Sequence, residues 1–144
     1  MTHNLSSEDL AYIAGIFDGE GCIRLSVNKN GPQITVYISN NNLELLEWLK
    51  TTIGAGSIQL SRKAEPEKNH KANYRYTIAS KLAVSLCKLI RPFLIVKASQ
   101  VDVILAYAAQ EETAGARQGF KVSKARIEAR ELVRAKLSAL KLVS

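Results

Sequence analysis

Two carboxylates stand close together near the start of the chain, in the run Asp18-Gly19-Glu20-Gly21. Carboxylate oxygens are preferred ligands of hard divalent cations such as Mg²⁺, so Glu20 is a candidate metal ligand. Asp18 lies about 200° around a helix from Glu20 and therefore points away from it. We expect Asp18 to hydrogen-bond backbone groups instead. One carboxylate is a small ligand set, so other groups must complete such a site.

The two acids end a segment, residues 10–20, that has the pattern of a short helix. Its apolar residues have the spacing of a buried helix face, at Ile13, Ile16 and Phe17. Small residues recur every four positions, at Ala11, Gly15 and Gly19. Glycine inside a helix costs about 1 kcal/mol relative to alanine, and the helix dipole disfavours acids in the last turn. These two losses of stability indicate that a second backbone approaches the helix and that an acid is needed at its tip.

Residues 13–21, IAGIFDGEG, resemble the nine-residue signature of the LAGLIDADG homing endonucleases in its DGEG variant. The resemblance implies that two such helices pack side by side, and one motif per chain then requires a homodimer. The implied interface comprises Ala11, Ala14, Gly15, Asp18 and Gly19. The resemblance also implies that Glu20, with Gly19 beside it, holds Mg²⁺ at the DNA backbone. Mn²⁺ should substitute for Mg²⁺, and Ca²⁺ should support binding without cleavage.

The implied activity of an intron-encoded enzyme of this family is a metal-dependent double-strand break in a long pseudo-palindromic DNA site. Cleavage across the minor groove would leave short 3′ overhangs. Phosphodiester hydrolysis needs a metal that activates water and a cation that absorbs developing charge. The resemblance covers about residues 10–110.

Two further positions are similar to the family pattern. Residues 91–97, RPFLIVK, match a stretch whose lysine reaches the active site, which implies this role for Lys97. The alternative is a solvent-exposed lysine at a helix start. Asn40, at the end of a predicted strand, matches an amide that positions water in the family. Asn40 is equally suited to capping the helix that follows.

Hydrophobic periodicity predicts the order α-β-β-α-β-β-α, followed by C-terminal helices. Expected helices span about 6–20, 43–53, 82–90, 98–110 and 123–142, and expected strands span 23–28, 33–39, 57–62 and 73–79. Residues 28–32 should form a turn, and Ser6 or Ser7, the Asn40–Asn42 run and Ser80 are the expected caps. The fold class is α+β, with a four-stranded antiparallel saddle sheet. We expect one domain over 1–144, with a core at about 6–111 and a C-terminal helical extension at about 120–143.

The two predicted hairpins have aliphatic side chains on one face and polar ones on the other. The polar face is rich in Arg, Gln, Asn, Ser, Thr and Tyr, whereas a face that is only solvated usually carries more Lys and Glu. Such side chains can bond base edges in a DNA major groove, which admits a β-ribbon. The expected DNA-contacting residues are Arg24, Ser26, Asn28, Lys29, Gln33, Thr35, Tyr37, Gln59, Ser61, Arg62, Lys63, Lys71, Asn73, Arg75 and Thr77.

Charge is distributed unevenly along the chain. Residues 1–114 carry 12 basic and 11 acidic residues, whereas residues 115–144 carry 8 and 2. An isoelectric point near 9.5 indicates a polyanionic partner. The last predicted helix has Arg126, Arg130 and Arg134 in one stripe, either as a DNA backbone contact or as a solvated face.

Other classes lack their characteristic residues. No apolar run approaches the roughly 20 residues of a membrane span, and the N-terminus lacks a signal-peptide pattern. Cys22 and Cys87 have no CxxC spacing, which favours a reduced intracellular compartment: the cytoplasm or an organelle with its own DNA. His3 and His70 are isolated, and no P-loop is present.

One alternative is a non-cleaving protein of this fold, an intron RNA maturase or a DNA-binding regulator. Another is a basic structural protein whose motif is coincidental.

Overall fold

The computed structural model describes residues 5–28, 31–114 and 124–143. Within them, the observed element order is α-β-β-α-β-β-α with two further helices, which confirms the predicted α+β fold. The elements are α1 (Ser7–Glu20), β1 (Gly21–Asn28), β2 (Gly31–Asn40), α2 (Leu43–Ile53), β3 (Ser57–Arg62), β4 (Asn73–Ala79), α3 (Ser80–Ile90), α4 (Ala98–Ala114) and α5 (Lys124–Val143). Single turns of 3-10 helix occur at η1 (Pro66–Lys68) and η2 (Arg91–Phe93).

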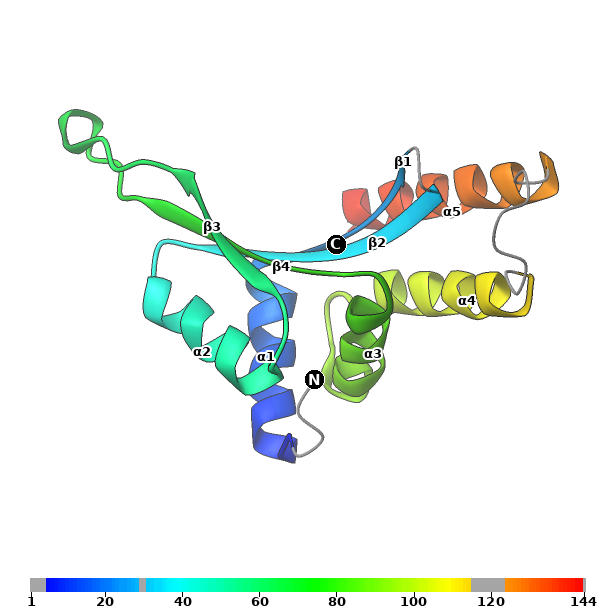
Figure 1. The fold of residues 1–144 in the computed structure, drawn as a ribbon, viewed down its shortest axis with the longest axis horizontal. Coiled ribbons are helices and arrows are strands. Elements are labelled where there is room, and N and C mark those ends of the chain that lie inside the picture. The colour runs from blue at the N-terminus through cyan, green and yellow to red at the C-terminus, as the bar shows by residue number, and fades with distance from the viewer. Residues whose placement is uncertain (1–4, 29–30, 115–123, 144) are drawn as a thin grey trace.

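The four strands form one antiparallel sheet in the order β1-β2-β4-β3. The β1–β2 register pairs Ile23 with Val36 and Leu25 with Ile34, so the aliphatic side chains of both strands share one buried face. β2 already begins at Gly31, which pairs with β1, so the expected turn is shorter than residues 28–32. The helices α1, α2 and α3 lie together on one side of the curved sheet, and the β3–β4 hairpin projects beyond them (Figure 1).

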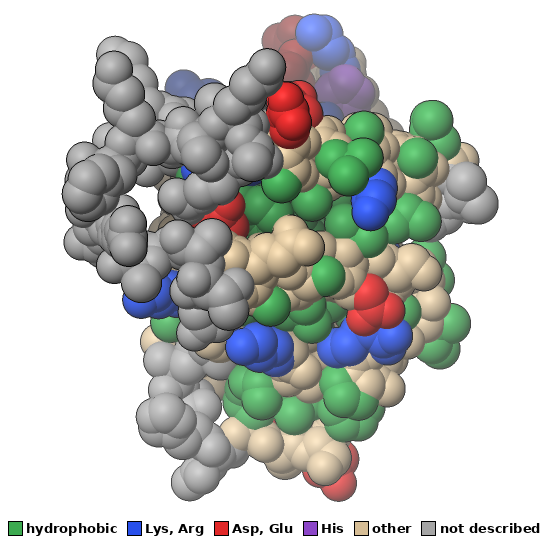
Figure 2. Space-filling model, turned by 90° about the vertical axis from the view of Figure 1, so that its right-hand side faces the viewer, with side chains coloured by type: hydrophobic (Ala, Val, Ile, Leu, Met, Phe, Trp, Pro, Cys, Tyr) green, Lys and Arg blue, Asp and Glu red, His purple; other side chains and the backbone are tan. Residues whose placement is uncertain are grey.

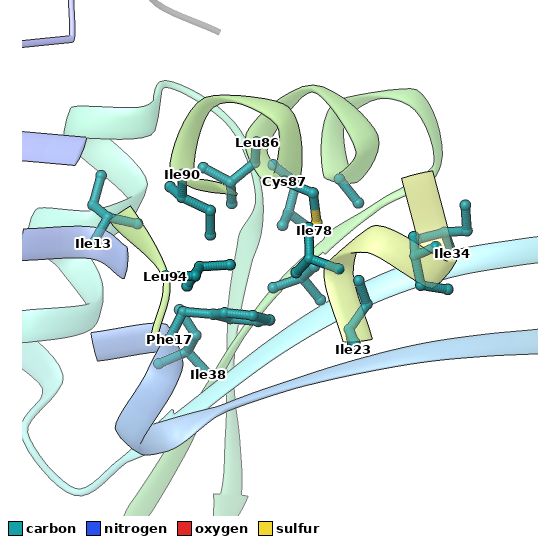
Figure 3. Close-up of a cluster of buried hydrophobic side chains, with 14 of the residues drawn as sticks. Ile13, Phe17, Ile23, Ile34, Ile38, Ile78, Leu86, Cys87, Ile90 and Leu94 are labelled. Carbon is teal, nitrogen blue, oxygen red and sulfur yellow. The ribbon is translucent and has the colours of Figure 1, made fainter. Parts of the chain in front are cut away.

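The hydrophobic core lies between this sheet face and the helices. Ile13 and Phe17 of α1 lie among side chains from the sheet, from α3 and from the segment after it, including Ile38, Ile90 and Leu94 (Figure 3). Burying one such large apolar side chain contributes about 1.5–3 kcal/mol. Because Ile13 and Phe17 are completely buried, the core holds α1 against the sheet and so determines where its last turn lies.

A buried tyrosine ties the α2–β3 connection to the centre of the sheet. Tyr76 of β4 is fully buried, and its hydroxyl donates a hydrogen bond to the carbonyl oxygen of Ala55 at 2.7 Å. Burial raises the pKa of Tyr76, because the phenolate would lose its hydration. Gly56 has φ 100°, and a Cβ there would lie 2.6 Å from the Tyr76 hydroxyl oxygen, so this position needs glycine.

The helix caps differ from the predictions at two positions. Asn42, rather than Asn40, caps α2: its side chain accepts a hydrogen bond from the N–H of Leu45 at 3.2 Å. The side-chain oxygen of Asn40 accepts from the N–H of Asn42 at 2.8 Å, so the capping interpretation of Asn40 is wrong. Ser80 is also not a cap, because Ala79 occupies the N-cap position of α3 and Ser80 has φ 59° inside the helix. Ser6 caps α1 as predicted.

The C-terminal helices extend the core and cover the edge of the sheet. α5 lies beside the edge strand β1 (Figure 1), and Lys141 Nζ donates to the carbonyl oxygen of Ile23 at 2.6 Å. Val133 and Leu137 of α5 are buried in the same cluster as Tyr107 of α4. A helix on an edge strand occupies carbonyl groups that could otherwise pair with another chain.

The predicted arginine stripe on α5 does not form one exposed face. Arg130 is only 4% exposed, whereas Arg134 is exposed and the side chain of Arg126 lies outside the described residues. Both interpretations of the stripe, as a DNA contact or as a solvated face, are therefore wrong for Arg130. Its guanidinium instead lies near Tyr107, whose pKa rises to about 12 because of burial and the charge of Glu111.

No helix within the described residues is long and apolar enough to span a membrane. Cys22 and Cys87 are both free thiols. Cys87 is buried in α3, and burial raises its pKa to about 12.

Candidate active site

The candidate site lies where α1 ends and β1 begins. Glu20 is the last residue of α1, its side chain is exposed, and it makes no hydrogen bond or ion pair with any described residue. A Cβ at Gly21 would lie 2.6 Å from the carbonyl oxygen of Phe17, so glycine is needed for the chain to turn directly from helix to strand. The close contact of Gly21 is thus with Phe17 of its own helix.

Lys97 supplies the positive charge that the last turn of α1 lacks. α1 has no basic residue in that turn, and Lys97 Nζ donates to the carbonyl oxygens of Phe17 (3.1 Å) and Asp18 (2.7 Å). A cation at a helix C-terminus is stabilised by the helix dipole. Lys97 is therefore not the freely solvated lysine of the alternative interpretation. The carbonyl groups that its ammonium binds belong to residues three and two positions before Glu20 in α1.

Asp18 holds the segment that carries Lys97. Its carboxylate accepts hydrogen bonds from the backbone N–H groups of Ile95 (2.8 Å) and Lys97 (2.9 Å), as its predicted backbone-bonding role requires. Burial disfavours the charged form of Asp18, but the N–H donors of residues 95–97 and the Lys97 charge outweigh it, so the pKa of Asp18 is lowered. Asp18 is thus held by backbone groups of its own chain, and its place at a dimer interface stays a prediction.

Asn40 lies at the same end of the sheet as Glu20. Gly21 pairs with Ile38 across β1 and β2, and Asn40 follows two residues later. The structure therefore brings Glu20, Lys97 and Asn40 to one end of α1. Whether Asn40 positions water remains a prediction.

The small residues of α1 lie on its exposed side, with one exception. Ala11, Gly15 and Gly19 are exposed, and a Cβ added at either glycine would meet nothing within 4 Å. Ala14 is fully buried in the core, so its predicted place at an interface is wrong. The unpartnered stripe therefore consists of Ala11, Gly15 and Gly19.

The described residues contain no cluster of three or more His, Cys, Asp or Glu side chains that could enclose a metal ion. Mg²⁺ usually retains several waters and takes one or two carboxylates together with substrate phosphates. The exposed, unpaired Glu20 carboxylate is a hard oxygen donor of the required kind, and so these residues fit a shared Mg²⁺ site that further groups complete.

The polar face of the sheet carries most of the predicted DNA-contacting side chains in accessible positions. The accessible residues are Arg24, Ser26, Gln33, Tyr37, Gln59, Ser61, Arg62, Lys63, Lys71, Asn73, Arg75 and Thr77. Thr35 is a correction, because only 4% of its surface is exposed and it has little surface to offer DNA. Lys29 and the side chain of Asn28 lie outside the described residues.

The described residues at the β1–β2 end of the molecule form no continuous basic patch (Figure 2). Figure 2, which views the molecule from the β1–β2 end, shows Lys and Arg scattered among hydrophobic and polar side chains on the described part of that face. The candidate nucleic-acid interface is the polar face of the sheet, which carries accessible side chains from both hairpins.

Sequence reasoning missed one contact near the site. Lys141, 118 residues after Ile23, reaches the strand that follows Glu20 and lies 3.7 Å from the Cys22 sulfur. The basic composition of the C-terminal region was the only signal, and it could not indicate which lysine reaches β1.

Helix, sheet and site together define a LAGLIDADG-type fold. A family model described as the LAGLIDADG-like domain matches residues 7–90, more than half of the sequence, and the chain belongs to this family. The interpretation of the motif as coincidental is therefore excluded. No curated protein sequence matches the chain.

Solved homing endonucleases share the fold at low sequence identity. I-CvuI, in complex with a DNA target, superposes with a TM-score of 0.69 and 13% identity over 92% of this chain and 82% of its own. I-TnaI gives a TM-score of 0.64 and 18% identity, covering 96% and 95% of the two chains. I-AabMI, bound to uncleaved DNA, gives a TM-score of 0.70 and 23% identity over 93% of this chain but only 48% of its own. At these identities the similarity establishes the fold alone.

Proposed function

We propose that this chain is a homing endonuclease that makes a metal-dependent double-strand break in a long pseudo-palindromic DNA site as a homodimer. The observation that carries the proposal is the arrangement at the end of α1. There, an unpaired Glu20 carboxylate ends the helix whose last-turn carbonyl groups Lys97 binds, and it lies at the end of the open stripe of Ala11, Gly15 and Gly19. A protein that used α1 only for its core would need none of these three features.

The open stripe supports the homodimer. Gly15 and Gly19 lower the helical stability of α1 without relieving any crowding inside the chain, since a Cβ at either position meets nothing. A second α1 packed against the stripe would explain both residues. Two-fold symmetry would bring two copies of Glu20 together and complete a ligand set that one chain lacks. I-CvuI and I-TnaI have lengths similar to this chain, as expected for a relative with one domain per chain.

Each part of the site has a chemical role in this proposal. When bound, Mg²⁺ would polarise a phosphate and activate water, held by Glu20 carboxylates with the Gly19 backbone beside them. Lys97 would hold a positive charge where charge develops on the phosphate. Asn40 would orient water through its amide. Mn²⁺ would replace Mg²⁺, and Ca²⁺ would support binding only; I-CvuI has been crystallised with its target in the presence of Ca²⁺.

The open sheet face would supply the DNA contacts. A dimer with two-fold symmetry matches a target with the same symmetry, and half-sites of about one helical turn give roughly 20 base pairs. The contacts to bases would come from the polar side chains of both hairpins, while the lysines around the β3–β4 loop would contact phosphates.

The decisive experiment is cleavage of a randomised duplex library with Mg²⁺ by wild type, Glu20→Gln and Glu8→Gln. Wild type should produce cut ends that recur at one pseudo-palindrome. Glu20→Gln should abolish cutting and retain binding in Ca²⁺, because the amide keeps the shape of the side chain and loses its charge. Glu8→Gln is the matched control at the other, exposed end of α1 and should cut like wild type.

Two results would contradict the proposal. Cutting by Glu20→Gln at the wild-type rate would remove the metal-ligand role of Glu20. Binding without cutting by all three proteins would favour the non-cleaving maturase or regulator, and tighter binding to intron RNA than to duplex DNA would separate the first from the second.

A further inference from the structure

One arginine on the polar sheet face is held in place by an aromatic ring. The guanidinium carbon of Arg75, in β4, lies 5.1 Å from the centre of the Tyr37 ring, in β2. Arg75 is opposite Ser39 on one side and Gln59 on the other, so it stands within the sheet rather than at its edge. A guanidinium over an aromatic face is attracted by the ring quadrupole, and the contact restricts where this long side chain points.

The polar groups of Arg75 remain unused by the protein. Its side chain is exposed and makes no hydrogen bond or ion pair with any described residue. Several neighbours on the same face are already engaged: Ser61 and Asn73 bond each other, and Arg62 donates to the Lys71 carbonyl oxygen. Arg75 therefore combines a restrained position with a full set of free donors.

We propose that Arg75 reads a guanine in each half-site of the target and that Tyr37 is its positioning residue. This inference rests on the proposed function. The major-groove edge of guanine presents two acceptors, O6 and N7, which a guanidinium binds with two parallel hydrogen bonds. Such a bidentate contact requires the plane of the guanidinium to be oriented, and the Tyr37 ring provides that orientation before DNA binds. A contact to a phosphate, in contrast, would carry no sequence preference.

The experiment selects bound duplexes from a randomised library in Ca²⁺, so that no cleavage step enters the readout. Wild type is compared with Arg75→Ala, Arg75→Lys, Tyr37→Phe and Tyr37→Leu, after thermal denaturation has verified that each variant folds. Lys71→Ala is the control for a phosphate contact, because this exposed lysine lies in the loop between β3 and β4.

Wild type should enrich guanine at one position in each half-site. Arg75→Ala and Arg75→Lys should reduce that preference about 5- to 150-fold and leave the other positions unchanged, since lysine cannot make the bidentate contact. Tyr37→Phe keeps the ring and should retain the preference, whereas Tyr37→Leu should weaken it at the same position. Lys71→Ala should weaken binding to all sequences equally and reduce the salt dependence by about one counterion.

The proposal is overturned if Arg75→Ala weakens all sequences equally, as Lys71→Ala should, or if its preferences equal those of wild type. The assignment of Tyr37 as the positioning residue is overturned if Tyr37→Leu retains the full guanine preference. If wild type enriches no duplex at all, the proposed function itself fails, and the two failures are thereby distinguished.

Discussion

At the scale of single residues, Asp18 and Lys97 make reciprocal contacts between α1 and the segment before α4. Each side chain hydrogen-bonds to the backbone of the segment that carries the other. The Asp18 carboxylate accepts backbone N–H groups of that segment, and the Lys97 ammonium donates to backbone carbonyls of α1. Each charged group therefore hydrogen-bonds to backbone groups rather than to the other charged group. This arrangement fixes the distance between the end of α1 and the start of α4, and Glu20 lies two residues after Asp18.

Asp18→Asn should make the protein less stable by about 1–2 kcal/mol at neutral pH, because hydrogen bonds to a charged acceptor are lost. The folded-state pKa of Asp18 lies below its unfolded value. The stabilisation is therefore complete above pH 4 or so and disappears as pH falls through the folded-state pKa. Urea denaturation from pH 7 to pH 2 should show the difference from wild type shrinking below about pH 4. Glu47→Gln, at an exposed position of α2, should show no such difference; an equal loss in both variants would contradict the assigned role.

At the scale of elements, two sides and one end of α1 have three different roles. One side packs in the core through Ile13, Ala14 and Phe17, and the opposite side is the open stripe. The C-terminal end presents Glu20. Gly15 and Gly19 therefore belong to the open stripe, whereas Gly21 is needed for the turn into β1, and substitution can separate the two reasons.

Gly21→Ala should destabilise the protein by about 1–3 kcal/mol, because its Cβ would collide with the backbone of Phe17, which cannot move without disturbing the core. Gly19→Ala, two residues earlier, meets open space and should stabilise the isolated chain by up to about 1 kcal/mol. Urea denaturation at low protein concentration measures both. Equal effects of the two substitutions would show that the turn after α1 does not have the described geometry.

At the scale of the whole molecule, the open stripe predicts how two chains associate. Gly15→Leu should leave the fold of one chain intact, because a Cβ at this exposed position meets nothing within 4 Å, and should prevent close packing of two α1 helices. Sedimentation velocity should show monomers for Gly15→Leu and dimers for wild type. Ala135→Leu, on an exposed face of α5, is the matched control and should remain dimeric. A Gly15→Leu dimer of unchanged affinity would place the interface elsewhere.

Much of the architecture could be predicted from the sequence, because periodicity reports which side of an element is buried. The alternation in β1 and β2 indicated the correct buried face, and the end of α3 before Pro92 followed from proline sterics. The predictions that failed concern burial by neighbouring side chains, which the spacing of residues in the sequence does not report. Ala14 and Ala11 are the same residue type, and only the packed structure assigns Ala14 to the core.

The same limit applied to the site. The motif and the P-F-L…K stretch indicated Glu20 and Lys97, yet the contact between Lys97 and the end of α1 joins residues about 80 apart and could not be deduced from spacing. Strand alternation placed Thr35 on the polar face but could not show how closely its neighbours cover it. The choice among Asn40, Asn41 and Asn42 as the cap depended on backbone angles that identical side chains do not reveal.

The contacts between Asp18 and the segment of Ile95 to Lys97 also set an order of events during synthesis. Residue 18 leaves the ribosome long before residue 97, and at about 5–20 residues per second the interval is several seconds. During that time the end of α1 lacks both the cation that satisfies its carbonyls and the segment that its carboxylate holds. A nascent chain should therefore acquire the assembled site only after residue 97 has left the ribosome.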